Sequence, residues 1–258
     1  MSKNIQEYKY KIGIILVNYN GKIYNEQCIN SINLSTYKNY SIYVIDNDSK
    51  DNSIEVLREK FGESINIILN KENLGFSCAN NIGIKQAIND GCDYILMLNN
   101  DTIIENNMIE EMVNTSIENK GAAVCPKIYY YDNKKIVWAA GGSINWSKGL
   151  PIQYGIDEFD SIDISQEKEV KFATGCCLLI SKKVIEKVGL LSDEYFLYYE
   201  DTDYSVRILN SGNKIIYAPK AKMYHKVSAS TGGNKSKLLI YYMTRNRLIF
   251  NKRFNNNL

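Results

Sequence analysis

Carboxylate, amide and imidazole groups in this chain stand where apolar segments end. The apolar run YILML, residues 94–98, stops at Asn99, Asn100 and Asp101. Hard cations such as Mg²⁺ and Mn²⁺ bind carboxylate oxygens, and Mn²⁺ also accepts an imidazole nitrogen. Asp101 and His225, the single histidine, are therefore candidate ligands of a cation that would neutralise a diphosphate leaving group. Each has a structural alternative: Asp101 could cap the helix that follows it, and His225 could be a core histidine.

The densest acidic cluster is Glu200, Asp201 and Asp203, in the segment FLYYEDTDYSVRI. One of these carboxylates could act as a general base, because the aromatic neighbours would exclude water and raise its pKa. The structural alternative is a helix start, in which Asp201 is the N-cap and the other two oppose the helix dipole. Asp203 and Arg207 are four residues apart and could form an ion pair on such a helix.

Charge is divided unevenly along the 258 residues. Residues 204–258 carry eleven Lys and Arg and no Asp or Glu, although the net charge of the chain is only +2. This basic segment is either a solvated face or a surface that meets something anionic, such as a phosphate or a membrane. The basic helix expected over 235–254 could pack on the sheet or contact a membrane peripherally.

Several common types of site are missing from the sequence. There is no P-loop, no G-x-G-x-x-G dinucleotide motif and no G-x-S-x-G nucleophile elbow. The six cysteines form no C-x-x-C pair, which disfavours a zinc site. The N-terminal MSKNIQEYKYK has no apolar signal region, and no run approaches the ~20 apolar residues that span a bilayer. We therefore expect a cytoplasmic protein, with any membrane contact peripheral and at the inner face of the plasma membrane.

The spacing of apolar residues alternates along the chain between the period of a strand and that of a helix, which predicts the elements that position these residues. Strands alternate with helices in the first half, which is typical of an α/β fold with a mostly parallel sheet. In such sheets ligands bind beyond the C-terminal strand ends, and three of these ends carry polar clusters, at 18–20, 46–51 and 99–101. The predicted strands are 11–19, 40–47, 65–70 and 93–100, and the predicted helices are 21–33, 51–62, 75–90 and 103–119.

The sequence of the second half of the chain predicts the strands of a mixed region. The stretch 147–168 lacks clear periodicity and is expected to be a mobile loop. Ser181 is expected to cap a short helix over 181–189, and a helix over 201–212 is expected to end at Gly212. The predicted strands are 121–131, 135–146, 169–180, 214–219 and 221–225.

Eight short motifs, each weak alone, together make a specific pattern. They are VNYNG (17–21), VIDNDSKDNS (44–53), NLGFSCANNIG (73–83), LMLNNDT (96–102), FATGCCLLI (172–180), FLYYEDTDYSVRI (196–208), YHKVSAS (224–230) and YYMTRN (241–246). The set resembles family 2 glycosyltransferases of GT-A fold, particularly the rhamnosyltransferase-like branch. The resemblance implies one GT-A domain over 1–258, with a nucleotide-sugar-binding half (1–102), an acceptor and catalytic half (103–234) and a basic C-terminal helix (235–258).

The resemblance implies an inverting sugar transfer by direct displacement, with Asp201 as general base beside Glu200. Asp101, in the position of the family's D-x-D motif, and His225 would bind Mg²⁺ or Mn²⁺. Asn99 stands where many relatives carry an acidic residue, which leaves one carboxylate and weakens the expected metal affinity. The residues implied to bind the nucleotide-sugar are Val17, Asn18, Tyr19, Asn20, Asp46, Asn73, Gly75, Asn81, Asn99, Asn100, Gly175 and Arg245.

The implied partners are a UDP- or dTDP-sugar donor, rhamnose included, and a saccharide or lipid-linked saccharide acceptor used in surface polysaccharide synthesis. No nucleic-acid partner is expected. Two alternatives stay open: a sugar-phosphate nucleotidyltransferase, and a non-catalytic carbohydrate- or membrane-binding module. The first normally has a Gly-rich N-terminal loop with a basic residue, which VNYNGK lacks, and the acidic residues argue against the second.

Overall fold

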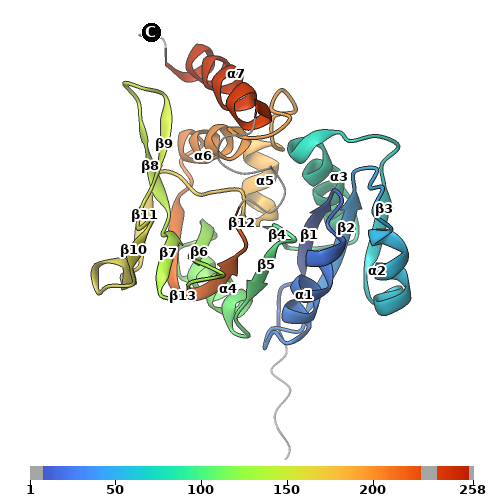
Figure 1. Cartoon of the computed structure of the whole chain (residues 1–258). Coiled ribbons are helices and arrows are strands. Elements are labelled where there is room, and N and C mark those ends of the chain that lie inside the picture. The colour runs from blue at the N-terminus through green and yellow to red at the C-terminus, as the bar shows by residue number, and fades with distance from the viewer. Residues whose placement is uncertain (1–7, 228–236, 256–258) are drawn as a thin grey trace, which may run out of the picture.

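A parallel sheet forms the first half of the molecule, as the alternating periods predict. The computed structural model describes residues 8–227 and 237–255. The strands lie in the order β4-β1-β2-β3, and all three neighbouring pairs are parallel (Figure 1). The elements are β1 (Ile12–Asn18), α1 (Lys22–Asn33), β2 (Tyr40–Asp46), α2 (Ser53–Phe61), the 3-10 turn η1 (Gly62–Ser64), β3 (Asn66–Leu69), α3 (Gly75–Asn89) and β4 (Tyr94–Leu98).

Side chains of β1 point alternately to two hydrophobic cores, one on each face of the sheet. Ile14 and Leu16 belong to the core that contains residues of α1, α2 and α4 (Met108–Glu118). Ile15 belongs to the opposite core, which contains residues of α3, α5 (Lys182–Val188) and α6 (Glu200–Asn210). Burial on both faces explains why β1 is almost wholly aliphatic.

The second half extends the same sheet with mixed strand directions. β12 (Cys177–Ser181) lies antiparallel to β4 and to β6 (Ala123–Tyr130), and β13 (Ile215–His225) runs parallel to β6. The mixed half of the predicted fold class is therefore confirmed. The remaining strands are β5 (Thr102–Ile104), β7 (Ile136–Ala139), β8 (Gly142–Asn145), β9 (Leu150–Gln153), β10 (Glu158–Phe159) and β11 (Lys168–Val170), and η2 (Asp163–Ser165) is a 3-10 turn.

Five predictions differ from the structure. The two strands predicted over 214–219 and 221–225 are one strand, β13, with a register shift between Ala218 and Lys222. The expected loop over 147–168 contains β9, which pairs with β8 in a hairpin, and β10, which pairs with β7. The predicted strand 135–146 breaks at Gly141, where φ is +70°. The predicted strand 169–180 is two strands, because the chain leaves β13 and crosses to β4. The predicted helix 103–119 begins only at Met108, because β5 pairs with β13 first.

Two of the structural alternatives for acidic residues are wrong, while other predicted helix ends are confirmed. Asp101 does not cap α4, whose N-cap is Asn107, and Asp201 lies inside α6 after the N-cap Tyr199. Ser181 does cap α5, since its Oγ accepts a hydrogen bond from the N–H of Val184 at 3.4 Å. Gly212 follows α6 with a φ of +80°.

The basic helix α7 (Lys237–Phe254) packs on the protein, and Figure 1 shows it above α6, beside the tip of the β8–β9 hairpin. Phe250 forms a small hydrophobic cluster with Tyr195, Tyr199 and Val206. Residues 235–236 of the predicted helix, and the end of the YHKVSAS motif, lie outside the described residues. Across the described ranges, no helix has both the length and the apolar character that crossing a membrane requires.

Candidate active site

Buried amides join the ends of β1, β2 and β4 into one polar network. Asn18 Nδ2 donates to Asp46 Oδ1 at 2.7 Å and to Ser53 Oγ at 2.8 Å. Asn18 Oδ1 accepts from Asn25 Nδ2 at 2.7 Å, and Asn100 Nδ2 donates to Asn25 Oδ1 at 2.7 Å. The parallel register, in which Asn18 is opposite Asp46, brings these residues together. The sequence therefore predicts their common location correctly.

Both carboxylate oxygens of Asp46 accept hydrogen bonds from other residues of this chain. Its second oxygen, Oδ2, accepts a hydrogen bond from the Ser49 N–H at 3.1 Å, and the residue is buried. The carboxylate therefore fixes the turn after β2, and its expected contact with the nucleotide-sugar stays a prediction.

Residues that follow β1 form the more open part of this edge. Val17 is half-buried, whereas Tyr19 is 50% exposed. Asn20 adopts a left-handed φ of +53°, and its Oδ1 accepts from the Lys50 N–H at 2.7 Å. Tyr19 is the residue of this group that could stack on a planar base.

The start of α3 touches the loop that leads into α6. Asn73 Oδ1 accepts from the Gly75 N–H at 3.0 Å, and Phe76 N–H donates to the Phe196 carbonyl at 2.7 Å. A Cβ on Gly75 would lie 2.4 Å from that carbonyl oxygen, and φ at Gly75 is +80°. Only glycine fits here, so the two predicted residues Asn73 and Gly75 shape a junction between the halves.

The β4 end places Asp101 against His225. The β5–β13 pairing sets Thr102 opposite His225, and the Asp101 carbonyl accepts from the Lys226 N–H at 3.0 Å. As a result Asp101 Oδ1 lies 3.2 Å from His225 Nε2, and both side chains are buried. Trp138 covers the imidazole edge-on, with ring centroids 4.5 Å apart.

Two buried atoms of this pair lack hydrogen-bond partners within the described residues. Asp101 Oδ1 and His225 Nδ1 are both in this state, although Asp101 Oδ1 lies 3.2 Å from the other ring nitrogen, Nε2. Burial alone would lower the pKa of His225, but the neighbouring Cys176 and Asp101 raise that pKa to about 10. A pKa of about 10 makes the imidazole a cation that pairs with Asp101 near neutral pH, so a divalent cation would have to displace the ring proton before the two side chains could hold it. The described ranges hold no group of three or more His, Cys, Asp or Glu arranged for a metal, so this pair would need ligands from the substrate.

The carboxylates of Glu200 and Asp201 begin α6. Asp201 Oδ2 accepts from the Gly175 N–H at 3.0 Å, and Oδ1 accepts from the Thr202 N–H at 2.7 Å and from its hydroxyl at 3.1 Å. Glu200 Oε2 is buried and accepts no hydrogen bond within the described part of the chain. A Cβ on Gly175 would lie 3.4 Å from the Asp201 Cβ and 3.7 Å from Glu200 Oε1, so all three residues border one space.

Burial gives these two carboxylates different acidities. Burial, and then the charge of Asp201, raise the pKa of Glu200 well above its usual value. Burial also raises the pKa of Asp201, but hydrogen bonds from Gly175 and Thr202 act in the opposite direction. Because hydrogen-bond donors stabilise its ionised form, Asp201 ionises more readily than Glu200, which tends to keep its proton.

The segment Gly175–Cys176 connects the two centres. Gly175 binds Asp201, and the next carbonyl, that of Cys176, accepts from the Asn99 N–H at 2.9 Å. The buried Cys176 also neighbours His225 and Asp101, whose charges affect its pKa. The sequence includes Gly175 among the site residues but gives no sign that this bridge exists.

Two predicted site residues have other roles in the structure. Asn81 donates to the Leu191 carbonyl at 2.9 Å and accepts from the Leu191 N–H at 3.0 Å, so its amide holds the loop before α6. Arg245 donates to the Glu194 carbonyl at 3.0 Å and to Asn246 Oδ1 at 2.7 Å. Neither side chain lies in the strand-end network, and their sugar-nucleotide contacts stay predictions.

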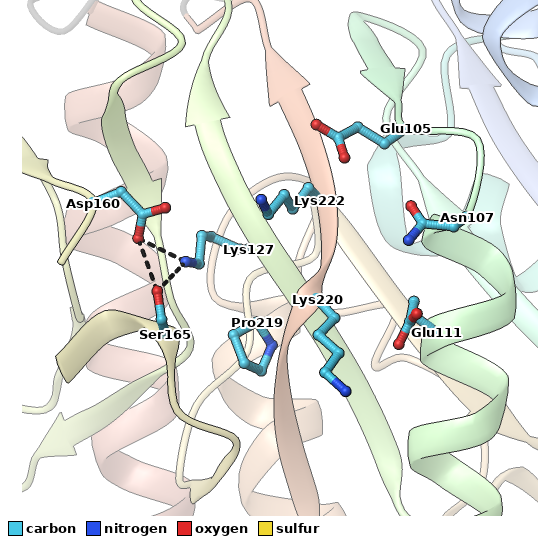
Figure 2. A pocket seen from close by; sticks show the side chains of 9 residues that line it. All are labelled: Glu105, Asn107, Glu111, Lys127, Asp160, Ser165, Pro219, Lys220 and Lys222. Carbon is cyan, nitrogen blue, oxygen red and sulfur yellow. Dashed lines mark hydrogen bonds and ion pairs between the residues drawn. The ribbon is translucent and has the colours of Figure 1, made fainter. Parts of the chain in front are cut away.

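A separate polar concavity of about 380 Å³ lies beside α4, β6 and β13, and Figure 2 shows its lining. Buried Lys127 donates there to Asp160 Oδ1 at 2.6 Å and to Ser165 Oγ at 3.0 Å. Three lysines face three carboxylates, so the concavity favours neither an anion nor a cation. None of its residues belongs to the predicted site; they are Glu105, Asn107, Glu111, Lys127, Asp160, Ser165, Pro219, Lys220 and Lys222.

Solved structures share this architecture. The structure of GalNAc-T7 with UDP, GalNAc and Mn²⁺ superposes with a TM-score of 0.71 at 16% identity, over 85% of this chain and 44% of that one. The full-length TarS structure of S. aureus gives a TM-score of 0.64 at 15% identity, over 96% of this chain and 40% of that one. The GT-A fold expected from the sequence is therefore confirmed.

Sequence relatives of this chain are described as sugar transferases. The chain is 26% identical to a dTDP-rhamnosyl transferase of Shigella flexneri over 216 residues, which is 83% of this chain and 68% of that protein. An uncharacterized glycosyltransferase of Rickettsia prowazekii is 31% identical over 79% of this chain, which spans 59% of that relative. The sequence profile described as glycosyl transferase family 2 matches residues 13–189. This chain is a member of glycosyl transferase family 2.

Proposed function

We propose that the protein transfers a sugar from a nucleoside-diphosphate sugar to a hydroxyl of a saccharide or lipid-linked saccharide, with inversion at the anomeric carbon. The observation that carries the proposal is the pairing of two centres across Gly175–Cys176. One is the carboxylate pair of α6, and the other is the Asp101–His225 contact at 3.2 Å. A direct displacement needs a base near the acceptor and positive charge near the departing diphosphate.

Each centre has a defined part in the proposed reaction. The Asp201 carboxylate accepts the proton of the acceptor hydroxyl as that oxygen attacks the anomeric carbon and the bond to the diphosphate breaks. Asp101 and His225 would hold a divalent cation, Mn²⁺ or Mg²⁺, which offsets the charge of the diphosphate when bound. Two protein ligands with further oxygens from the substrate phosphates is a common arrangement for Mg²⁺.

The donor is proposed to carry uracil or thymine, and rhamnose is among the sugars to test, since the Shigella flexneri relative is described as a dTDP-rhamnosyl transferase. The acceptor would approach from the second half, where Trp138 and the β8–β9 hairpin lie. Family membership, together with the adjacent carboxylates of buried Glu200 and partly buried Asp201, favours this function over a nucleotidyltransferase or a non-catalytic module.

The test begins with binding. Calorimetry with UDP and dTDP, each with and without Mn²⁺, should show binding that the metal strengthens, and a mass-spectrometric screen of sugar nucleotides should then find hydrolysis or transfer. Binding of neither nucleotide would sink the proposal. Release of pyrophosphate from a nucleoside triphosphate and a sugar phosphate would support the nucleotidyltransferase instead.

A further inference from the structure

Two consecutive residues with left-handed backbone conformations precede the carboxylate pair. Tyr198 has a φ of +68° and Tyr199 a φ of +71°, and Glu200 begins α6 directly after them. Bulky residues with a Cβ rarely adopt a positive φ, and such a conformation persists only where the surroundings enforce it. Some contact must therefore hold this turn.

Asn246 of α7 supplies that contact. Its Nδ2 donates to the carbonyls of Leu197 and Tyr198, both at 2.8 Å, and the residue is fully buried. Its Oδ1 accepts from Arg245 Nη1 at 2.7 Å, which fixes the orientation of the amide. One side chain thus binds two successive carbonyls of the turn, from a position 47 residues beyond Tyr199.

The Tyr198–Tyr199 turn positions the first residues of α6. The Tyr199 carbonyl accepts from the Asp203 N–H at 2.9 Å, a bond that belongs to the first turn of the helix. The Tyr199 hydroxyl donates to the Gly149 carbonyl at 2.9 Å, and its ring packs on Phe250 of α7. A rotation of the Tyr198–Tyr199 turn would therefore redirect Glu200 and Asp201 together.

We propose that Asn246 is a positioning residue, which holds the left-handed Tyr198–Tyr199 turn and thereby aims the Asp201 carboxylate at the acceptor hydroxyl. The inference rests on the proposed function, because it assigns the aim of a base to a reaction that is itself proposed. The strand-end network contains no residue of α7, and Arg245 keeps its bond to the Glu194 carbonyl when the Asn246 side chain is removed, so Asn246 would act on the catalytic step and not on donor binding.

Asn246→Ala tests the inference, with Thr244→Ala as the matched control on the same helix. Thr244 is exposed, so loss of its side chain should change little. With a sugar nucleotide that the wild-type protein turns over, Asn246→Ala should lower kcat about 100-fold, the effect of a misplacement near 1 Å. The donor KM and the affinity for UDP or dTDP with Mn²⁺ should stay within about threefold of wild type, because the donor site is intact.

A second substitution separates positioning from a general loosening of α7. Asparagine adopts positive φ far more readily than tyrosine, so Tyr198→Asn in the Asn246→Ala protein should recover at least about tenfold in kcat. A kcat of Asn246→Ala within twofold of wild type, a parallel rise in donor KM, or no recovery in the double variant would each overturn the inference.

Hydrogen exchange gives a readout that does not depend on turnover. The amide of Asp203, bonded to Tyr199, should lose about tenfold in protection in Asn246→Ala and regain it in the double variant, while α3 stays unchanged. Unchanged exchange at Asp203 would overturn the inference even if the proposed reaction is correct. Absence of turnover and nucleotide binding in the wild-type protein would refute the proposed function separately.

Discussion

Asp201→Asn is the most direct test of the base. In the wild-type protein Oδ2 accepts a hydrogen bond from the Gly175 N–H and Oδ1 accepts one from the Thr202 N–H, so both carboxylate oxygens face N–H groups. An asparagine keeps one oxygen and turns its amide N–H₂ toward one of these N–H groups. A buried donor left without an acceptor costs about 1–3 kcal/mol, so the variant should fold with a free energy of unfolding lowered by that amount at most.

The loss in rate should be much larger than this structural effect suggests. A positioned general base contributes roughly 10²- to 10⁴-fold to rate, which corresponds to about 3–5 kcal/mol of the barrier. Asp101, His225 and the strand-end amides stay in place, so the affinity for UDP or dTDP should not change. We therefore expect a fall in kcat of at least about 100-fold with nucleotide binding preserved.

The pH dependence of kcat/KM tests whether Asp201 is the general base. Burial raises the pKa of Asp201, against the hydrogen bonds from Gly175 and Thr202 that lower it. A base works in its ionised form, so wild-type kcat/KM should fall as the pH drops through this raised pKa, at a pH above the ordinary aspartate value of about 3.9. Initial rates of nucleoside-diphosphate release between about pH 4.5 and 8 measure this limb, which should be absent from the residual activity of Asp201→Asn.

An exposed aspartate provides the control for this experiment. Asp193→Asn removes the same charge from the surface near α6 and should leave both the rate and the acid limb unchanged. Wild-type turnover by Asp201→Asn, with the acid limb intact, would show that another group is the base. Glu200 would then be the first alternative, since it borders the same space beside Gly175.

Three further predictions concern neighbouring carboxylates. Asp101→Asn should abolish the strengthening of UDP or dTDP binding by Mn²⁺ in calorimetry while metal-free binding persists, and undiminished strengthening would place the cation elsewhere. Asp203 is fully buried between Arg207 Nε at 2.6 Å and Arg253 Nη1 at 2.5 Å. Asp203→Ala should lower the free energy of unfolding in urea by about 3 kcal/mol, the low end for a broken buried ion pair, because both arginines are partly exposed. A loss under about 1 kcal/mol would contradict this prediction. Burial raises the pKa of Glu200, so the stability that its protonated form gives is lost as the pH rises through that pKa. Glu200→Gln cannot ionise, so it should raise the thermal midpoint of unfolding at pH 8 by about 2–4 °C and leave it unchanged near pH 4.

The sequence predicts the first half of the fold well because its signals are local. Aliphatic runs bounded by polar residues predict β1, β2 and β4, and parallel strands must end at the same edge. The meeting of Asn18, Asp46 and Asn100 follows from that rule alone. The predicted Asp203–Arg207 pair is also confirmed, since a helix places residues four apart on one face.

Contacts between distant parts of the chain account for what the sequence does not predict. Trp138 against His225, Asn246 against the Tyr198 carbonyl and Gly75 against Phe196 each depend on the complete fold. No local pattern predicts a left-handed tyrosine either, because propensity argues against it. The partners of Arg245 in this structure, Glu194 and Asn246, also depend on how α7 docks, and its contact with a nucleotide-sugar stays a prediction.

Hydrogen bonds within the chain hold some polar residues of the site in place and leave atoms of others unpaired. The Asn18 side chain has partners for both its oxygen and its nitrogen, and both Asp46 oxygens accept hydrogen bonds, so these two residues hold the strand ends together and their contacts with a nucleotide-sugar stay predictions. Asp101 Oδ1, His225 Nδ1 and Glu200 Oε2 are buried without a hydrogen-bond partner within the described residues. Unpaired buried polar atoms cost free energy that a ligand can recover. Five further residues carry such atoms within the described part of the chain, namely Ser35, Ser77, Tyr195, Arg207 and Asn251, so only the three named here coincide with the proposed centres. They occur at the two centres where the proposed reaction needs charge, beside the diphosphate and beside the acceptor.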